Sequence, residues 1–371
     1  MTTIKTSRES LLDPLQSVIG IVEKKHTMPV LANVLILSAN QRLSMTATDL
    51  EVQIRTNPEP LTDQESEFIQ FAVSAKKLHD ILRNLPDHCA LNLEVNENRL
   101  TIKSGKSRFN LQIVKGEDFP TVKTTDSPGV ILNIPQKTLK TLLERVQFAM
   151  AQQDVRYYLN GALLQVVGNQ LTVVATDGHR LSYTMELLPD YHEKIEAIIP
   201  RKTIFELIKL LSPTEEMVRM TLRSNQVEFL FGNIELLSKV IDGKFPDYHR
   251  VIPQNYNKHL VLQRLELLQA LQRATILSNE KVKGVRLLLA KNCLAIVCTN
   301  SEQEEAKEEI DVIYDQEPMD IGFNFTYLLD VMNHINVENM ICSLGDANSS
   351  LLMSVPEAEE RFKYVVMPMR I

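Results

Sequence analysis

Apolar residues recur along this chain with two spacings, one typical of helices and the other of strands. Between Leu139 and Val146 they follow the i, i+3, i+4, i+7 pattern of a single buried helix face. Short runs such as Leu100–Lys103 and Val227–Phe231 alternate or stay apolar over a few residues, which predicts strands. Together the patterns predict six amphipathic helices with strands between them, the helices spanning residues 9–22, 74–85, 136–150, 201–211, 264–278 and 324–335.

The elements repeat. Leu43–Asp49 (LSMTATD) is echoed by Leu171–Asp177 (LTVVATD) and more weakly by Leu294–Asn300 (LAIVCTN), and the threonines at 48, 176 and 299 lie 128 and 123 residues apart. A Phe-Pro pair at 119–120 returns at 245–246. A fixed period of this kind indicates repeated structural units. We therefore predict three similar α+β domains with antiparallel sheets, each ordered helix, strands, helix, strands, over residues 1–128, 129–256 and 257–371.

Composition places the chain among ordinary globular proteins, with 44% hydrophobic and 23% charged residues. No apolar run approaches the ~20 residues of a membrane-spanning helix, and the N-terminal sequence lacks the basic and apolar regions of a secretory signal. The four cysteines have no metal-ligand spacing and are typical of buried thiols in a reducing compartment. We expect a cytoplasmic protein.

Charge separates the helices from the rest of the chain. The chain carries −7 overall, which argues against tight DNA binding through a basic surface but not against topological contact with DNA. The six predicted helices carry −2, +2, +2, +2, +1 and −1 in chain order, or +4 together. If the helices share one side of an assembly, that side is mildly basic and suited to weak, salt-sensitive, sequence-independent binding. A solvated set of helix faces explains the same charges equally well.

One stretch offers candidate catalytic chemistry. A strand over Leu171–Val174 leads into a tight turn at Gly178, which brings Asp177, His179 and Arg180 together. General acid–base catalysis there would need a nucleophile or metal as well, and the corresponding stretches at 49–51 and 300–302 lack the His and Arg. A hydrolase built on this cluster is nevertheless an alternative. A scaffold that is built from the repeats and does not close into a ring is another.

Cofactor motifs are missing from the sequence. Residues 104–107 (SGKS) match the end of a phosphate loop, but Leu100 stands where the first glycine is required. The histidines are scattered without metal-binding spacing. We expect no cofactor, metal or catalytic residue.

Several longer motifs resemble one family. Residues 154–161 (DVRYYLNG), 175–181 (ATDGHRL), 242–248 (DGKFPDY) and 364–370 (YVVMPMR), with 276–281 and 322–324, are similar to the β sliding clamps of bacterial DNA polymerase III. The resemblance covers the whole chain. It implies a non-enzymatic homodimer, closed head to tail into a ring of six clamp domains, with helices lining a hole around duplex DNA and sheets outside. Its implied partners are the DNA polymerase III catalytic subunit, the clamp loader complex and other proteins with a clamp-binding motif.

The same resemblance implies three sets of site residues. A partner-peptide groove would be formed by Arg156, Leu159, Thr176, Gly178, His179, Arg180, Leu181, Pro246, Arg250, Val251, Asn324, Tyr327, Ser350, Val365, Met367, Pro368, Met369 and Arg370. The resemblance and the positive charge of the helices together predict that Lys25, Lys76, Gln153, Tyr157, Tyr158, Arg201 and Lys202 face DNA. The dimer interface would be formed by Lys77, Lys106, Arg108, Phe109, Ile276, Leu277, Glu302, Glu304, Glu305 and Glu308. Asn348 takes a position where an apolar groove residue is expected.

Overall fold

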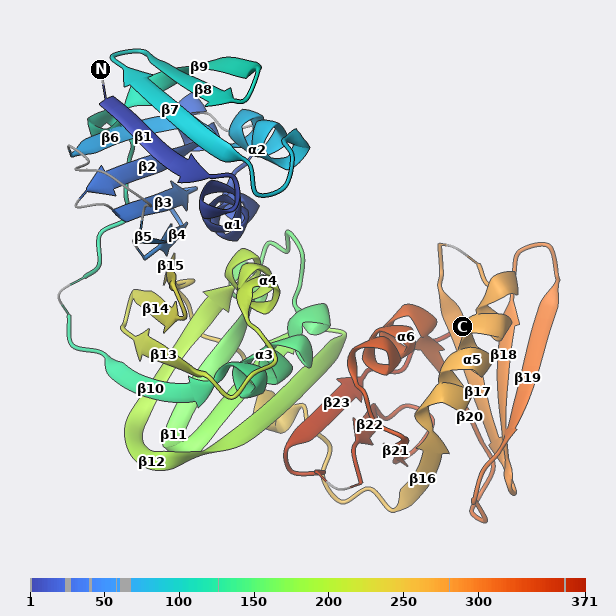
Figure 1. Ribbon diagram of the computed structural model, residues 1–371. Helices are drawn as coiled ribbons and strands as arrows, with labels where there is room; N and C mark the ends of the chain where they lie inside the picture. Colours follow the sequence, from blue (N-terminus) through green and yellow to red (C-terminus); the bar gives the residue numbers. More distant parts are fainter. Residues whose placement is uncertain are drawn as a thin grey trace. The chain divides into compact units, whose positions relative to one another are not determined.

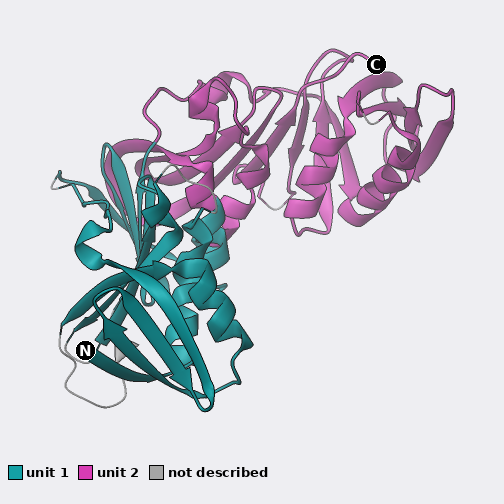
Figure 2. Ribbon diagram, turned by 90° about the horizontal axis from the view of Figure 1, so that it is seen from above, with its two compact units in different colours: residues 1–139, 205–240 teal, residues 140–204, 241–371 magenta. Residues whose placement is uncertain are grey.

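The computed structural model describes residues 2–23, 28–39, 42–57, 59–60, 68–125, 127–279, 281–356 and 358–371 (Figure 1). Contacts divide the chain into two compact units, residues 1–139 with 205–240 and residues 140–204 with 241–371 (Figure 2). The units do not follow the repeat, because the middle repeat contributes strands to both. The predicted domain edges at 128/129 and 256/257 stay a prediction.

Unit 1 is built on one long antiparallel sheet in which strands of the first and middle repeats are continuous. Its order is β1-β7-β8-β9-β6-β2-β3-β4-β15-β14-β13-β10, with β5 paired to β3. The strand bounds are β1 Thr2–Ser7, β2 Asn33–Ala39, β3 Arg42–Thr48, β4 Val52–Thr56, β5 Glu59–Pro60, β6 Ile69–Ser74, β7 Ala90–Asn96, β8 Arg99–Ser104, β9 Ser107–Lys115, β10 Val130–Pro135, β13 Met217–Leu222, β14 Gln226–Phe231 and β15 Ile234–Lys239.

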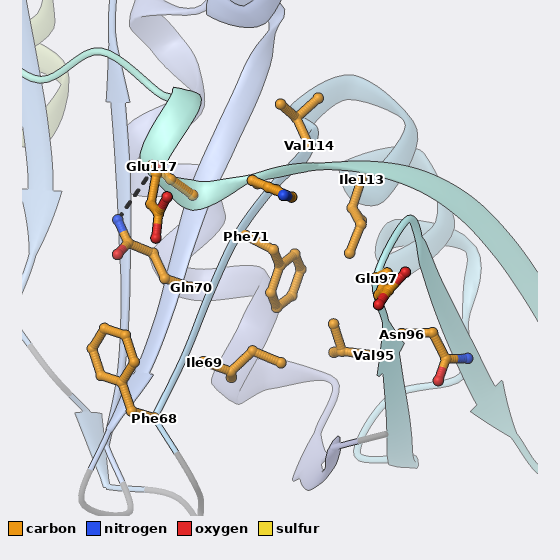
Figure 3. A pocket seen from close by; sticks show the side chains of 12 residues that line it. Phe68, Ile69, Gln70, Phe71, Val95, Asn96, Glu97, Ile113, Val114 and Glu117 are labelled. Carbon is orange, nitrogen blue, oxygen red and sulfur yellow. Dashed lines mark hydrogen bonds between the residues drawn. The ribbon is translucent and has the colours of Figure 1, made fainter.

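Strand β9 turns a corner in this sheet. Residues 107–112 pair with β8, and the register then changes so that Ile113–Lys115 pair with β6. The corner leaves a cavity of about 480 Å³ between the ends of β6 and β7, where Figure 3 shows the ring of Phe71 with Ile69, Val95 and Ile113 around it.

Unit 2 contains two sheets. The six-stranded sheet has the order β11-β12-β23-β22-β21-β16, and the four-stranded sheet has the order β19-β18-β17-β20. The strand bounds are β11 Gly161–Thr176, β12 Arg180–Pro200, β16 Lys258–Gln263, β17 Gly284–Ala290, β18 Cys293–Thr299, β19 Glu305–Asp311, β20 Met319–Asn324, β21 Asn339–Leu344, β22 Leu351–Ser354 and β23 Phe362–Val366. Strands β11 and β12 are each long enough to span the positions of two strands in the other repeats. Two register shifts near Gly168 interrupt their pairing.

The six predicted helices form in the described part of the chain, but each opening helix is shorter than predicted. The long apolar pattern of residues 9–22, 136–150 and 264–278 continues through a short 3-10 turn after the α-helix ends. Ser74 caps α2, its hydroxyl accepting from the Lys77 amide at 3.5 Å, and Asn324 caps α6 by accepting from the Thr326 amide. The bounds are α1 Glu9–Val18, α2 Ala75–Asn84, α3 Gln136–Glu144, α4 Arg201–Leu210, α5 Arg264–Ala274 and α6 Phe325–His334.

Apolar faces of the helices pack on the sheets and on each other. In unit 1, α1 packs against α2 and against β3 and β4, and its Leu11, Leu15 and Val18 side chains are fully buried. In unit 2, α5 packs against α6 and against β18 and β19. None of the helices in the described ranges is long and apolar enough to span a membrane.

Two strand pairs join successive repeats in the same register. Strand β4 of the first repeat pairs with β15 of the middle one, with Gln53 opposite Leu237. Strand β12 of the middle repeat pairs with β23 of the third, with Leu181 opposite Val365. We call these the first and second junctions; the first lies within unit 1 and the second within unit 2.

Candidate functional site

The Asp or Asn of the repeated pair closes a turn in all three repeats, and the turn is one residue longer in the third. The Asp177 carboxylate accepts from the amides of His179 and Arg180 at 2.9 and 3.1 Å. Asp49 accepts from two amides in the same way, and so does the Asn300 side-chain oxygen. A short Asx side chain that binds the backbone two residues on is a turn-forming device. The shared residues of the motif therefore have a structural role.

Arg180 is the centre of a buried polar cluster, which we call the Arg180 node. Its guanidinium is 9% exposed, binds Asp177 at 3.1 Å and Asp330 of α6 at 2.5 Å, and donates to the carbonyl of Phe148. It also lies over the ring of Tyr327 at 4.5 Å, a cation–π distance. Because Asp177 belongs to the middle repeat and Asp330 to the third, the node fixes the two repeats to each other across the second junction.

Electrostatics keep this guanidinium charged. Burial alone would lower the pKa of Arg180, but the Tyr364 hydroxyl and the Asp330 and Asp177 carboxylates outweigh burial and raise it. The Tyr364 hydroxyl donates to the carbonyl of Tyr327 at 3.0 Å, and burial raises the pKa of this phenol. Both groups thus stay in their ordinary protonation states near neutral pH.

A groove of about 360 Å³ lies beside the node, over the paired ends of β12 and β23. His179 and Met367 lie next to each other in its lining, and both are exposed, Met367 with 49% of its surface. The lining is Thr176, Gly178, His179, Arg180, Leu181, Pro246, Tyr248, Arg250, Val251, Ser350, Val365 and Met367. Apart from Tyr248, every member was predicted for the partner-peptide groove.

Tyr248 was missed by sequence reasoning. Its ring is buried among Leu181, Tyr183 and Val365, and its hydroxyl donates to Gln165 at 3.2 Å. Burial raises the pKa of this hydroxyl to about 12. The FPDY motif contained the signal, since an aromatic residue two positions after Pro246 has no counterpart after Pro120, where Val122 stands.

The remaining predicted groove residues lie around the groove without lining it. Arg156 binds Asp154 at 2.9 Å and donates to the Asp177 carbonyl at 3.1 Å, so it supports the turn from outside. That guanidinium lowers the pKa of Asp154 to about 2. Leu159 is buried, Asn324 caps α6, and Tyr327 lies against Arg180. Pro368, Met369 and Arg370 belong to the C-terminal tail, residues 367–371.

The C-terminal tail is held at two points. The Met367 amide donates to the His179 carbonyl at 3.0 Å, and the Met369 amide donates to the Gly322 carbonyl at 2.7 Å. A methyl group added at Gly322 would come within 2.4 Å of the Met369 carbonyl oxygen, so only glycine allows this close approach. The terminal Ile371 side chain covers both Gly322 and Gly284. The tail therefore crosses from the middle repeat to the third and carries Met367 into the groove.

The predicted DNA-facing residues are partly engaged within the protein. Arg201 donates to the carbonyl of Met150 at 2.8 Å, and Tyr158 packs against the core beside Tyr248. Tyr157, at 58% exposed, and Lys76 and Gln153 are open to solvent, while Lys202 is half-buried. Lys25 lies outside the described residues.

The predicted interface residues are spread over both units, within each of which they are accessible. Ile276 is 77% exposed and Phe109 is half-buried on β9. Glu308 is bound by Arg273 of its own chain at 2.6 Å, which was not foreseen. Lys77, Lys106, Arg108, Glu302, Glu304 and Glu305 are exposed, and Leu277 is half-buried. Asn348 is exposed in a turn where its amide donates to the Asp346 carboxylate at 2.9 Å, and it does not line the groove.

Comparisons with known proteins agree along the entire chain. Models of the N-terminal, central and C-terminal domains of the DNA polymerase III beta subunit match residues 2–123, 133–247 and 249–370. The beta sliding clamps of Pseudomonas putida and Escherichia coli K12 are 45% and 42% identical, each match covering 98% of both chains. A crystal structure of the Pseudomonas aeruginosa sliding clamp bound to griselimycin is 44% identical and covers 100% of both chains with a TM-score of 0.94. This chain belongs to the family of DNA polymerase III beta subunits, the bacterial beta sliding clamps.

Proposed function

We propose that two copies of this chain close head to tail into a ring around duplex DNA. On this proposal the ring has no catalytic role and holds the replicative polymerase on its template. It also serves as a docking platform for the clamp loader and for repair proteins. The observation that carries the proposal is the pair of equivalent junctions, because a chain of three repeats with two internal junctions leaves one half of a third junction at each end.

Among the strands that end a sheet or pair on one side only, β9 and β19 are the ones that correspond to the junction strands. Residues 107–112 of β9 pair with β8, and β19 pairs with β18; in the described part of the chain neither has a partner on its other side. When the hairpins of the three repeats are aligned by their residue pairing, β9 corresponds to β15 and β23, and β19 corresponds to β4 and the start of β12. An unpaired strand edge is a template for pairing with another chain.

The register of the internal junctions predicts the register between subunits. Gln53, Leu181 and Glu305 are equivalent, and so are Leu237, Val365 and Asn110. These equivalences place Glu305 of one subunit opposite Asn110 of the other. At the next position along the two strands, Ala306 would lie opposite Phe109, close to the exposed Ile276 of the 3-10 turn after α5. Lys106 and Arg108 on one side and Glu304 and Glu305 on the other supply opposite charge at the rim, which sets register more than affinity.

Removal of Phe109 tests this interface. Phe109→Ala should shift sedimentation from dimer to monomer at low micromolar concentration, because an aromatic anchor in an interface is commonly worth more than ~2 kcal/mol. Val114→Ala is the matched control, since Val114 lies on the same strand beyond the proposed contact and is 37% exposed. A Phe109→Ala protein that stays dimeric at every concentration would contradict the placement.

Retention on DNA tests the ring itself. Clamps loaded by a cognate, ATP-driven loader should stay on nicked circular DNA in high salt and leave when the circle is cut, because topology and not charge holds them. The net charge of −7 makes tight direct binding to phosphates unfavourable. Equal retention on circular and linear DNA would refute encirclement.

We also propose that the groove at the second junction binds a short extended peptide of the polymerase or loader. Leu181, Val365 and Met367 offer an adaptable apolar surface, and His179 and Arg250 lie at its edges. Griselimycin, which the Pseudomonas aeruginosa clamp binds, is a suitable probe. Met367→Ala should raise its Kd about tenfold, equal to ~1.4 kcal/mol. Met217→Ala, a methionine of similar exposure in unit 1, should leave the Kd unchanged.

A further inference from the structure

The two junctions are built alike, yet the chain segment that follows the Phe-Pro pair behaves differently at each. After Pro246 the chain forms a 3-10 turn, Tyr248–Arg250, that becomes one wall of the groove. After Pro120 residues 121–125 have no regular secondary structure, and we call them the first linker segment. The difference follows from what each junction offers this segment.

Two buried glutamines hold the first linker segment. The Gln53 side chain, 4% exposed, accepts from the Val122 amide at 2.9 Å and donates to the Val122 carbonyl at 3.4 Å. The Gln226 side chain, 6% exposed, accepts from the amide and hydroxyl of Thr125 at 2.9 Å and donates to the Lys123 carbonyl at 2.9 Å. A carboxamide both donates and accepts, so each glutamine binds an extended backbone much as a neighbouring strand would.

The positions of these glutamines have exact structural counterparts at the second junction. Gln53 pairs with Leu237 as Leu181 pairs with Val365, so Gln53 corresponds to Leu181. Strand β14 pairs with β15 as β22 pairs with β23, which places Ser350 where the first junction has Gln226. Both Leu181 and Ser350 line the groove. At the first junction, the first linker segment therefore covers the positions that correspond to the groove-lining residues Leu181 and Ser350 of the second junction.

The replacements change what each surface can bind. The leucine side chain cannot hydrogen-bond a backbone, and the serine hydroxyl oxygen is two bonds closer to its own backbone than the polar atoms of the glutamine carboxamide. With Tyr248 in place of Val122, the second segment is anchored by an aromatic ring in the core and not by amide contacts along its backbone. This ring covers Leu181, but the part of the groove lined by Ser350, Arg250 and Val251 is left open to an external ligand.

We propose that the first linker segment is an internal ligand of the first junction, and that Gln53 and Gln226 are the residues that keep it there. It takes the place that a partner's extended peptide takes at the second junction, so the two glutamines decide which junction is offered to partners. This inference rests on the proposed peptide-binding role of the second junction.

The test uses the full-length chain with Gln53→Leu and Gln226→Ser, which gives the first junction the residues of the second. Hydrogen exchange at the Val122 and Thr125 amides should become at least tenfold faster. Trypsin cleavage after Lys123 should accelerate by a similar factor, because a protease needs a released, extended segment. Cleavage after Arg250 reports on the second junction in the same digest and should not change.

Single variants and a control keep the outcome interpretable. Gln226→Ser alone should release Thr125 but leave Val122 protected, which separates local release from general unfolding. Asn225→Ala removes an exposed hydrogen bond to the Thr125 hydroxyl at 3.2 Å and should leave both rates unchanged. Unchanged exchange and cleavage in the folded double variant would overturn the inference. None of these readouts needs DNA or a partner, so a failed ring or peptide assay would leave them standing.

Discussion

Neutralising Asp330 should weaken the second junction by an amount that the geometry of the Arg180 node sets. In Asp330→Asn the guanidinium loses one carboxylate but keeps Asp177 at 3.1 Å and the Phe148 carbonyl. The loss should therefore be that of one charge-assisted hydrogen bond, about 1.5–3 kcal/mol of unfolding free energy for unit 2. Arg180→Met removes the shared partner of both carboxylates and should cost more, about 3–5 kcal/mol.

A matched surface pair supplies the baseline. Asp320 binds Arg286 in the same unit, but the two side chains are 50% and 45% exposed. Asp320→Asn should cost no more than about 1 kcal/mol, because solvent screens an exposed ion pair. The order expected for the three variants is Arg180→Met, then Asp330→Asn, then Asp320→Asn.

Urea unfolding followed by circular dichroism gives the free energies, and griselimycin titration gives the effect on the groove. Since Arg180 lines the groove, Asp330→Asn should also raise the griselimycin Kd several-fold, whereas Asp320→Asn should not. Equal destabilisation by Asp330→Asn and Arg180→Met would refute the view that Asp177 compensates. Loss of stability with an unchanged Kd would show that the node supports the fold and not the groove.

Three further outcomes follow from single contacts. Gly322→Ala should loosen the C-terminal tail and raise the griselimycin Kd, because its methyl group meets a backbone oxygen; Gly284→Ala meets only the flexible end of the Ile371 side chain and should change the Kd little. Burial raises the pKa of the Cys342 thiol to about 12, so at pH 8 it should react with a thiol reagent far more slowly than the half-buried Cys89, as mass spectrometry of labelled peptides can show. The pKa of Asp154 is lowered to about 2, so its contribution to stability should be complete above pH 4 and disappear as the pH falls towards 2, with Asp154→Asn removing that part of the acid transition.

Periodicity predicted the helices well because each buries one continuous apolar face. It overran the ends of the three opening helices, since the apolar spacing continues into the 3-10 turns and a single spacing does not distinguish an α-helical turn from a 3-10 turn. The Thr-Asx motif was found as a repeat, and its cause, a side chain that closes the turn, became visible only with the hydrogen bonds of Asp49, Asp177 and Asn300.

The groove residues were predicted through family resemblance, but the hydrogen bonds and ion pairs that hold them in place were not. Arg180 was expected among the groove residues that meet a partner peptide, but most of its hydrogen-bonding capacity is used by Asp177, Asp330 and a carbonyl. Asp330 lies 150 residues from Arg180, on a helix whose sequence marks it only as a polar position. Contacts of this range depend on how β12 and β23 pair, and no local pattern encodes that pairing.

The open edges of β9 and β19 carry charges that limit which strands can pair with them. Unpaired strand edges risk indiscriminate pairing with other chains, and proteins reduce that risk by placing charges on edge strands. Strand β19 carries Glu305, Glu308 and Glu309 among its seven residues, with Lys307 bound to Glu309 at 2.6 Å. Two β19 edges would repel each other, whereas β9 begins with the basic stretch around Arg108. The same charges that would discourage β19 from pairing with a copy of itself would thus favour the proposed head-to-tail pairing of β19 with β9, and between these two strands that pairing would propagate the register of the two internal junctions.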